Sequence, residues 1–455
     1  MYHISRTGRY YFTSKNFSGM KRKHLLLLVL ALVLVSGASA YYLTYHVPAK
    51  TVETGVPQTE MPDNSGAVQA KMVNLRRDFK LPQDPKPLPD YIAGSIDWLV
   101  QAQSPDGGWG AGLHSRQNIT DPHAVKTDPA TTAIAGMALI RVGNTLDAGP
   151  QHANLHKALD YLLKAVENTP DQAMNITTQH GTQPQTKLGE NIDVALTSQF
   201  FSRVLPLTVN RAEMEKQVQD ALARCVQIIE NSQQKDGSWS VSGWAPVLNS
   251  AMACNALELA DLNGVEVDSN IIKRAQSYQR GNVSASGSAR TDKSAGVALY
   301  SLSSSQRNNV QLSKKAEKVL GAPMASQKSK SVAELKKDME DKGVAAEEAQ
   351  TLSEAVVNYN AVSDQMDRDD VLSGFGNNGG EEFLSYMMTS ESYVHAGDDK
   401  WEKWYAKMSG LFAQTQNKNG SWSGHHCITS PVFCTAVVIM TLTPDRDPLL
   451  LASKD

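Results

Sequence analysis

A seven-residue pattern, Q-x-x-[DN]-G-x-W, occurs three times in the chain and constrains its fold more than any other feature. Each copy is followed by a small-residue segment in which Ser or Thr precedes alanine, with a leucine seven positions after the Ser or Thr. Two linked elements that recur three times indicate repetition of one supersecondary unit. The pattern residues are Gln103, Asp106, Gly107 and Trp109; Gln233, Asp236, Gly237 and Trp239; and Gln416, Asn419, Gly420 and Trp422.

The chemistry of the pattern is that of a helix end. Glutamine suits the last turn of a helix, and Asp-Gly or Asn-Gly supplies the left-handed residue that terminates it. The tryptophan then buries about 150 to 250 Å² while its indole N–H needs an acceptor. Because the next segment carries Ala, Ser, Thr and Gly at close spacing, neighbouring helices can approach it closely. The repeat therefore predicts a structural staple ahead of a helix that belongs to an inner ring.

Helical periodicity dominates the chain from about residue 88 onwards, and no segment shows the Val/Ile-rich alternation of a strand. The sequence therefore predicts a nearly all-α domain over residues 88–445, with 446–455 as a tail. Between about 303 and 365 the composition shifts to Ser, Lys, Glu and Gln. Such wide polar faces are typical of outer helices or of an insertion.

With their small-residue helices, the repeats resemble the QW-type repeats of the terpenoid cyclase and protein prenyltransferase superfamily. The resemblance implies an α/α toroid, in which concentric inner and outer helices form about six pairs. It would cover nearly all of the chain after residue 88. The same architecture also serves proteins that catalyse nothing, so the resemblance implies a fold more than an activity.

The N-terminus carries a candidate targeting segment. Basic residues precede an apolar run from Leu25 to Val35, and Ala38-Ser39-Ala40 follows it. This order is typical of an export signal, but the adjoining "SGASAYYLTYHV" would extend it into a single-pass membrane anchor. Met20 is an alternative start for a compact signal. We expect residues 1–45 to be a signal or anchor, residues 46–87 to be a Pro-rich polar tether, and the toroid to lie outside the cytoplasm.

One acidic string matches a catalytic motif. Class II terpenoid cyclases use D-x-D-D, in which a carboxylic acid protonates an alkene or epoxide, and Asp367-Arg368-Asp369-Asp370 satisfies it. Its surroundings are polar, and Arg368 favours the ionised carboxylate. Catalysis by Asp367, Asp369 and Asp370 and a solvated acidic loop are therefore the two alternatives.

Cysteines and histidines near the third repeat suggest a second candidate site. His425, His426 and Cys427 carry suitable zinc ligands, although the Asp-x-Cys zinc ligands of the prenyltransferases and the D-D-x-x-D magnesium motif are absent from the sequence. Export would also permit disulfide bonds, with Cys427 to Cys434 and Cys225 to Cys254 as one possible pairing. Zinc is thus a possible cofactor, and buried free thiols are the alternative to the disulfides.

Three further residues are candidates for ligand binding. Asp193 lies in an otherwise apolar helical segment, where it is either a polar group of the central cavity or a cap at the helix start. Tyr386 and His395 share a helical segment with other aromatic residues, which at this spacing fits core packing as well as a ligand cage.

Three functional hypotheses follow, and only two of them make the protein an enzyme. The first is an exported or anchored toroid of the cell envelope that binds a hydrophobic ligand, a glycan or an envelope protein. The second is a terpenoid cyclase-like enzyme that protonates an isoprenoid through D-x-D-D. The third is a toroid-type polysaccharide lyase or hydrolase. A formal net charge of −3 gives no electrostatic reason to expect a nucleic-acid partner.

Overall fold

The computed structural model describes residues 85–452 apart from 240–241, 285, 377–378 and 398. The predicted signal or anchor, and the tether up to residue 84, lie outside the described residues. Within the described part, no helix is long and apolar enough to cross a membrane.

Six helices form a closed inner ring. Each contacts the next along the chain, and the last returns to contact the first. All residues of α4, α7 and α17 are buried, as the small and apolar side chains of these segments require. The ring helices are α4 (Pro129–Arg141), α7 (Ile192–Val204), α9 (Pro246–Leu262), α11 (Ala298–Leu320), α15 (Gly380–Ala396) and α17 (Pro431–Thr441).

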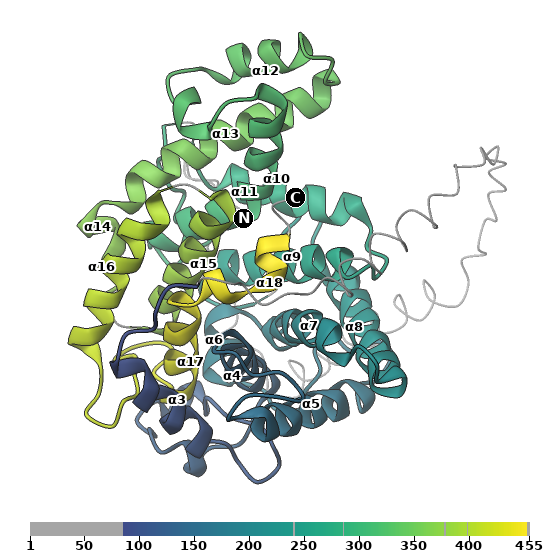
Figure 1. The fold of residues 1–455 in the computed structure, drawn as a ribbon, viewed down its shortest axis with the longest axis vertical. Coiled ribbons are helices and arrows are strands. Elements are labelled where there is room, and N and C mark those ends of the chain that lie inside the picture. Colours follow the sequence, from purple (N-terminus) through teal and green to yellow (C-terminus); the bar gives the residue numbers. More distant parts are fainter. Residues whose placement is uncertain (1–84, 240–241, 285, 377–378, 398, 453–455) are drawn as a thin grey trace, which may run out of the picture. The chain divides into compact units, whose positions relative to one another are not determined.

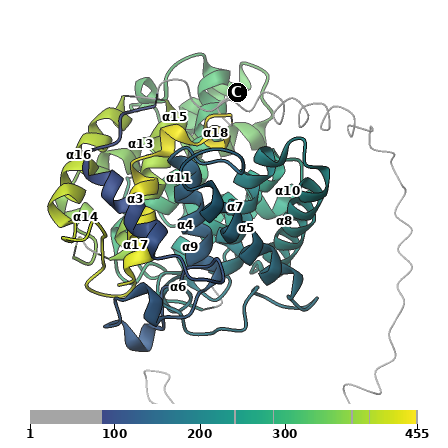
Figure 2. The same cartoon turned by 60° about the horizontal axis from the view of Figure 1, so that its bottom comes forward.

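Six outer helices alternate with the inner ones along the chain, and each packs on the ring. In Figure 2, α16 and α8 lie on opposite sides with α4, α7 and α11 between them. The described residues contain isolated β-bridges but no strand, so the predicted all-α toroid of about six pairs is confirmed. The outer helices are α3 (Tyr91–Gln101), α5 (His152–Glu167), α8 (Ala212–Ser232), α10 (Ser269–Gly281), α13 (Ala346–Met366) and α16 (Lys400–Thr415).

The repeats form the predicted staple. Trp109, Trp239 and Trp422 are fully buried, and each indole N–H donates to a carbonyl ten residues earlier, in the preceding outer helix, at 2.7–3.0 Å. Each tryptophan backbone N–H donates at 2.9 Å to the Ser or Thr hydroxyl that opens the small-residue pattern of the following inner helix. The two sequence elements recur together because this hydrogen bond joins them.

The repeat glutamines extend the staple to a second outer helix. Gln103, Gln233 and Gln416 each donate to the glycine carbonyl of their own turn, and also to a carbonyl of another outer helix at 2.9–3.2 Å. The glycine of each turn has a positive φ between 87° and 92°. At Gly237 an added Cβ would lie 2.3 Å from the Arg274 carbonyl oxygen, so the turn also requires glycine sterically.

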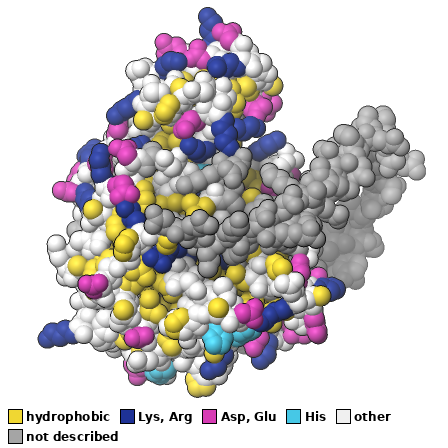
Figure 3. Space-filling model, in the orientation of Figure 1, with side chains coloured by type: hydrophobic (Ala, Val, Ile, Leu, Met, Phe, Trp, Pro, Cys, Tyr) yellow, Lys and Arg dark blue, Asp and Glu magenta, His cyan; other side chains and the backbone are white. Residues whose placement is uncertain are grey.

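The polar region of about residues 303–365 forms partly an insertion and partly the inner ring. Contrary to the outer-layer prediction, residues 303–309 are buried in α11 of the inner ring. The insertion is α12 (Val332–Glu340), which packs with α13 around a small separate core that includes Leu335, Met339 and Leu352. Charged side chains of both signs cover this end in Figure 3.

The remaining elements are short. They are α6 (Gln183–Leu188), α14 (Asp369–Leu372), α18 (Pro448–Ala452), η2 (His114–Arg116), η3 (Pro122–Ala124), η4 (Leu205–Thr208), η5 (Met324–Gln327) and η6 (Pro444–Arg446). The predicted tail therefore begins with ordered structure.

Buried ion pairs fill the ring interior where the C-terminal segment docks. Arg141 and Arg203 both pair with Asp447 at 2.8 Å, just ahead of α18, and Arg307 pairs with Glu391 at 2.9 Å. Arg141 also pairs with Glu391, and all of these side chains are at most 2% exposed. Charge pairing explains why residues 447–452 are held against the ring instead of forming a loose tail.

Candidate active site at the N-terminal mouth of the inner ring

The D-x-D-D string lies on the surface. Asp369 and Asp370 are on the short helix α14, where Lys407 pairs with Asp369 at 2.9 Å and Arg368 pairs with Asp370 at 2.6 Å. Hydrogen bonding from Arg368 lowers the pKa of the Asp370 carboxyl, whereas a proton donor needs a raised one. The catalytic prediction for Asp367, Asp369 and Asp370 is therefore wrong, and the solvated acidic turn is what the chain forms.

Tyr386 and His395 are core residues. The Tyr386 hydroxyl donates to the Leu372 carbonyl at 2.6 Å, and its ring packs against Trp404 and Phe412. His395 is fully buried, with Nδ1 3.4 Å from the Leu450 carbonyl oxygen. Packing accounts for both, so they do not form the predicted ligand site.

The N-terminal ends of the inner helices meet at one end of the ring, here called the mouth. Ahead of α7, the Gln183 side-chain oxygen accepts a hydrogen bond at 2.9 Å from the backbone of Ser430, ahead of α17. In α9, Asn249 donates to Asn191 at 2.5 Å. Loops that are distant in sequence therefore bring their polar side chains together here.

Two adjacent glutamates open α15 at the mouth. Glu381 and Glu382 are 2% and 0% exposed. Oε1 of Glu382 accepts hydrogen bonds from the Tyr300 hydroxyl at 2.6 Å and from the Phe375 backbone N–H at 2.8 Å, while its Oε2 has no hydrogen-bond partner. Oε2 of Glu381 accepts from the Ile428 backbone N–H at 3.3 Å.

The electrostatics of this pair favour a protonated Glu381. Burial and the neighbouring charge of Glu382 raise the pKa of Glu381 to about 7, because the interior penalises charge and two carboxylates repel. Burial and the charges of both glutamates also raise the pKa of Tyr300, so the phenol stays protonated and donates. The pair is suited to general acid and base catalysis near neutral pH.

His426 faces the unpartnered oxygen of Glu382. A Cβ added to Gly379 would lie 2.5 Å from Oε2 of Glu382 and 2.8 Å from Cε1 of His426, so both side chains converge beside this glycine. The His426 ring meets Phe375 edge-on at 5.3 Å, and neither of its nitrogens has a hydrogen-bond partner. Burial lowers the pKa of His426, which favours the neutral imidazole.

Cys427 adjoins this cluster with a strained backbone. Its φ is +61°, an unusual conformation for a non-glycine residue that is found preferentially at functional sites. Burial, followed by the charge of Glu381, raises the pKa of its thiol to about 11. Cys225, Cys254, Cys427 and Cys434 are all free, so the predicted disulfides do not form.

The predicted zinc site gains no support from this geometry. His425, His426 and Cys427 are close in sequence, but among the residues that the structure describes no three His, Cys, Asp or Glu side chains are placed to hold a metal ion. The His425 and His426 rings lie side by side, with centroids 4.8 Å apart, and His426 also packs on Phe375.

Lys187, the penultimate residue of α6, supplies a buried cation at the mouth. It is 3% exposed, and its Nζ lies 3.8 Å from the ring centroid of Trp244, which is 63% exposed. The Cys427 thiol lies within hydrogen-bonding reach of Lys187. The Lys187 charge also acts on the pKa values of Glu381, His426 and His114, in each case in the lowering direction. These three groups come from different segments of the chain.

Asp193 is buried near the same end of the ring, in the first turn of α7. Gln185 of α6 donates to its Oδ2 at 2.6 Å. Burial and the charge of Asp128 raise its pKa well above the usual range. The residue is buried in the ring interior, and its predicted role in ligand binding stays a prediction.

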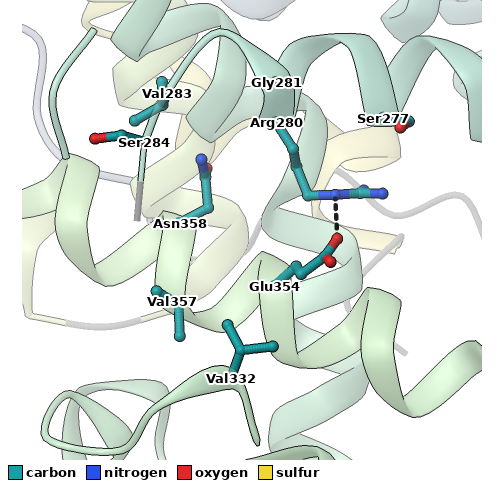
Figure 4. Close-up of a pocket in the computed structure, with 9 residues that line it drawn as sticks. All are labelled: Ser277, Arg280, Gly281, Val283, Ser284, Val332, Glu354, Val357 and Asn358. Atoms are coloured by element: carbon teal, nitrogen blue, oxygen red, sulfur yellow. Dashed lines mark ion pairs between the residues drawn. The ribbon is translucent and has the colours of Figure 1, made fainter. Parts of the chain in front are cut away.

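Among the pockets elsewhere, two illustrate the outer layer. In one, of about 290 Å³, Arg280 pairs with Glu354 at 3.5 Å (Figure 4). Arg280 also donates to Asn309. Another, of about 560 Å³, lies between α5 and α8 and carries acidic and basic residues together. The charged groups of the first are already paired, so the mouth remains the better candidate site.

Sequence reasoning missed the main groups of the mouth. Glu381 and Glu382 follow two glycines at a helix start, where acidic residues ordinarily face solvent. Burial and the charge of Glu382 raise the pKa of Glu381, and the residues that contact the pair, Ile428 and Tyr300, come from distant segments.

Comparison with known proteins supports the predicted resemblance. Residues 82–182, which include the first repeat, match the family model of the squalene-hopene cyclase C-terminal domain. A solved structure of a type II terpene cyclase from Scytonema, in complex with its product merosterolic acid A, is 12% identical; the alignment covers 83% of this chain and 98% of that chain, with a TM-score of 0.32. A search of curated proteins finds no match. The family match confirms the predicted resemblance to the terpenoid cyclase and prenyltransferase superfamily over residues 82–182.

Proposed function

From the resemblance to the terpenoid cyclase superfamily, we propose that the protein is an enzyme that protonates an isoprenoid at the mouth of its ring. Glu381 and Glu382 take the role that the sequence assigned to D-x-D-D. The observation that carries the proposal is the buried, adjacent carboxyl pair with the pKa of Glu381 raised to about 7. A carboxylic acid that stays protonated near neutral pH is what protonation of an alkene requires.

The proposed step balances within the site. The carboxyl proton forms a new C–H bond with one alkene carbon, the π bond breaks, and a cation forms on the other carbon. Glu381 gives up the proton, and the Ile428 N–H donates to the carboxylate that remains, while the Tyr300 hydroxyl and the Phe375 N–H donate to the neighbouring Glu382. Loss of a proton from the cation, or addition of water, completes the reaction and restores the acid.

The other two hypotheses have less support. No comparison points to an envelope-binding module or to a glycan-active enzyme, whereas the match over residues 82–182 points to the cyclase alternative. The hydroxyl and backbone donors around Glu382 also favour a role that involves charge development over passive packing.

Export remains part of the proposal. The basic and apolar leader in residues 1–45 would carry the toroid across a membrane or anchor it there. Fractionation of cells that express a C-terminally tagged full chain tests this. Recovery of the tag in the cytoplasm, with the leader intact, would contradict it.

The reaction is tested by incubating the full chain in D₂O with squalene, 2,3-oxidosqualene and geranylgeranyl diphosphate in separate reactions. Mass spectrometry is expected to detect a cyclised product of at least one of them that carries deuterium from the solvent. The Glu382→Gln variant serves as the control, since it keeps the shape but removes the neighbouring charge that helps to keep Glu381 protonated. If no substrate yields product, or if the variant yields as much as the wild type, the proposal is wrong.

A further inference from the structure

The Lys187 side chain is almost fully buried and has no acidic partner. Lys187 is 3% exposed, yet no described carboxylate pairs with it within the 4.0 Å that defines a salt bridge. Its neighbours are the Trp244 ring at 3.8 Å and the Cys427 thiol. Because buried charges are ordinarily paired, this ammonium lacks an anion.

Gln183 adds a second donor without an acceptor, on the same helix. Its Oε1 accepts hydrogen bonds from the backbones of Thr429 and Ser430 at 2.7 and 2.9 Å. These bonds fix the orientation of the amide, so its NH₂ group must point the other way. That Nε2 atom is buried and unpartnered, and it lies one helical turn before Lys187.

His114 adds a third group from a different segment. Leu113 and Thr182 form an antiparallel bridge, and side chains alternate across such a pairing. His114 and Gln183 therefore project to the same side of it. The His114 Nε2 atom is buried and unpartnered. Burial and the Lys187 charge lower the His114 pKa, which favours a neutral ring that can carry its hydrogen on Nε2.

We propose that Lys187, Gln183 and His114 together bind an anionic group, a carboxylate or a phosphate, at one end of the substrate. The inference rests on the proposed function and narrows its substrate to an isoprenoid with an anionic head. The exposed rings of Trp244 and Phe375, at 63% and 64% exposure, offer apolar surface for the rest of the molecule.

Charge at the mouth is compatible with this ligand. The Lys187 charge acts on Glu381, whose pKa is about 7; this carboxyl is largely neutral below that pH and then does not repel an anion. Oε1 of Glu382 already accepts hydrogen bonds from the Tyr300 hydroxyl and the Phe375 N–H. The anion and the acid therefore bind to separate groups of one site.

Isothermal titration of the full chain with farnesyl phosphate, farnesoic acid and farnesol tests the proposal. We expect both anionic probes to bind at least about tenfold more tightly than neutral farnesol, as charged hydrogen bonds allow. The tighter of the two anions identifies phosphate or carboxylate as the preferred head. Equal affinity for all three probes would overturn the anion site.

Variants separate this inference from the acid mechanism. Lys187→Met should weaken the binding of both anionic probes about tenfold or more and leave the affinity for farnesol unchanged. Lys273→Met, at an exposed position of α10, should change none of these affinities. Lys187→Arg keeps the charge and should retain binding if the methionine variant unfolds. Glu382→Gln should bind the anions normally while losing turnover. If folded Lys187→Met bound the anions with unchanged affinity, the proposed anion site would be refuted, while the proposed acid mechanism would not be.

Discussion

The Tyr300 hydroxyl donates a hydrogen bond to Glu382 at 2.6 Å, and the two residues lie in the first turns of neighbouring inner helices, α11 and α15. This hydrogen bond occupies one carboxylate oxygen and leaves the other, Oε2, without a partner beside His426. The closed ring of helices therefore does more than bury apolar surface: it holds a carboxyl group with one oxygen fixed and one oxygen available for a substrate.

Tyr300→Phe should slow turnover more than it affects folding. The substitution removes a donor that stabilises the Glu382 carboxylate as the proton leaves, so we expect kcat to fall about tenfold or more. Tyr386→Phe is the matched control, because its hydroxyl donates to the Leu372 carbonyl within the core. Steady-state kinetics and chemical unfolding of both variants check this. A larger kcat loss in Tyr386→Phe would contradict the assignment.

Glu381→Gln should remove a pH dependence of stability. The pKa of Glu381 is raised from 4.5 to about 7, so folding favours the protonated form. Its contribution is complete below about pH 4.5 and is lost as the pH rises to about 7, by an amount on the order of 3 kcal/mol. Urea unfolding from pH 4 to 8 should show this fall in the wild type and a flatter profile in the variant.

Glu347→Gln provides the control for that experiment. Glu347 occupies the first turn of α13, as Glu381 does in α15, but it is exposed. This variant should keep the wild-type pH profile. If all three proteins had the same pH profile, the protonation of Glu381 would not be linked to folding, which would contradict this prediction.

Trp239→Ala should destabilise the toroid severely, by about 3–5 kcal/mol. The side chain is fully buried, and its indole N–H donates to the Ile229 carbonyl at 2.7 Å. Trp244→Ala removes the same side chain a few residues later, at a position that is 63% exposed, and should cost far less. Thermal unfolding compares the two. Equal losses would refute the staple.

Thiol labelling should find four free cysteines, of which one reacts in the folded protein. Cys427 is half-buried, while Cys225, Cys254 and Cys434 are buried. Because its pKa is about 11, Cys427 should react slowly at neutral pH and faster as the pH rises. Cys427→Ser should abolish the native reaction. Fewer than four thiols after unfolding without reductant would reveal a disulfide.

The repeats predicted the fold because both ends of their hydrogen bonds are encoded locally. Trp239 finds its indole acceptor ten residues back in Ile229, and its backbone N–H reaches Ser250 at the start of the next inner helix. Together with the resemblance that they carry, these staples and the helical segments between them predicted about six pairs. Composition gave a wrong prediction of an outer layer only where polar residues, such as Asn308, are buried inside the ring.

The site could not be predicted in the same way, because its chemistry depends on contacts between distant segments. Asp370 satisfied a catalytic string but ends beside Arg368 on the surface. Glu382 belonged to no string, yet Tyr300 covers it from another helix. Lys187 matched no motif, and it is buried beside Trp244, which comes from another segment. Burial, which decides the chemistry of all three, is a property of the closed ring.

The most direct test compares product formation by Glu382→Gln and Asp370→Asn on the isoprenoid that the wild type converts. If the buried pair at the mouth is the acid, Glu382→Gln loses at least about a hundredfold in kcat, as removal of a general acid does, while Asp370→Asn stays within about twofold of the wild type, as expected for a surface position. Loss of activity in Asp370→Asn, with activity retained in Glu382→Gln, would contradict the account.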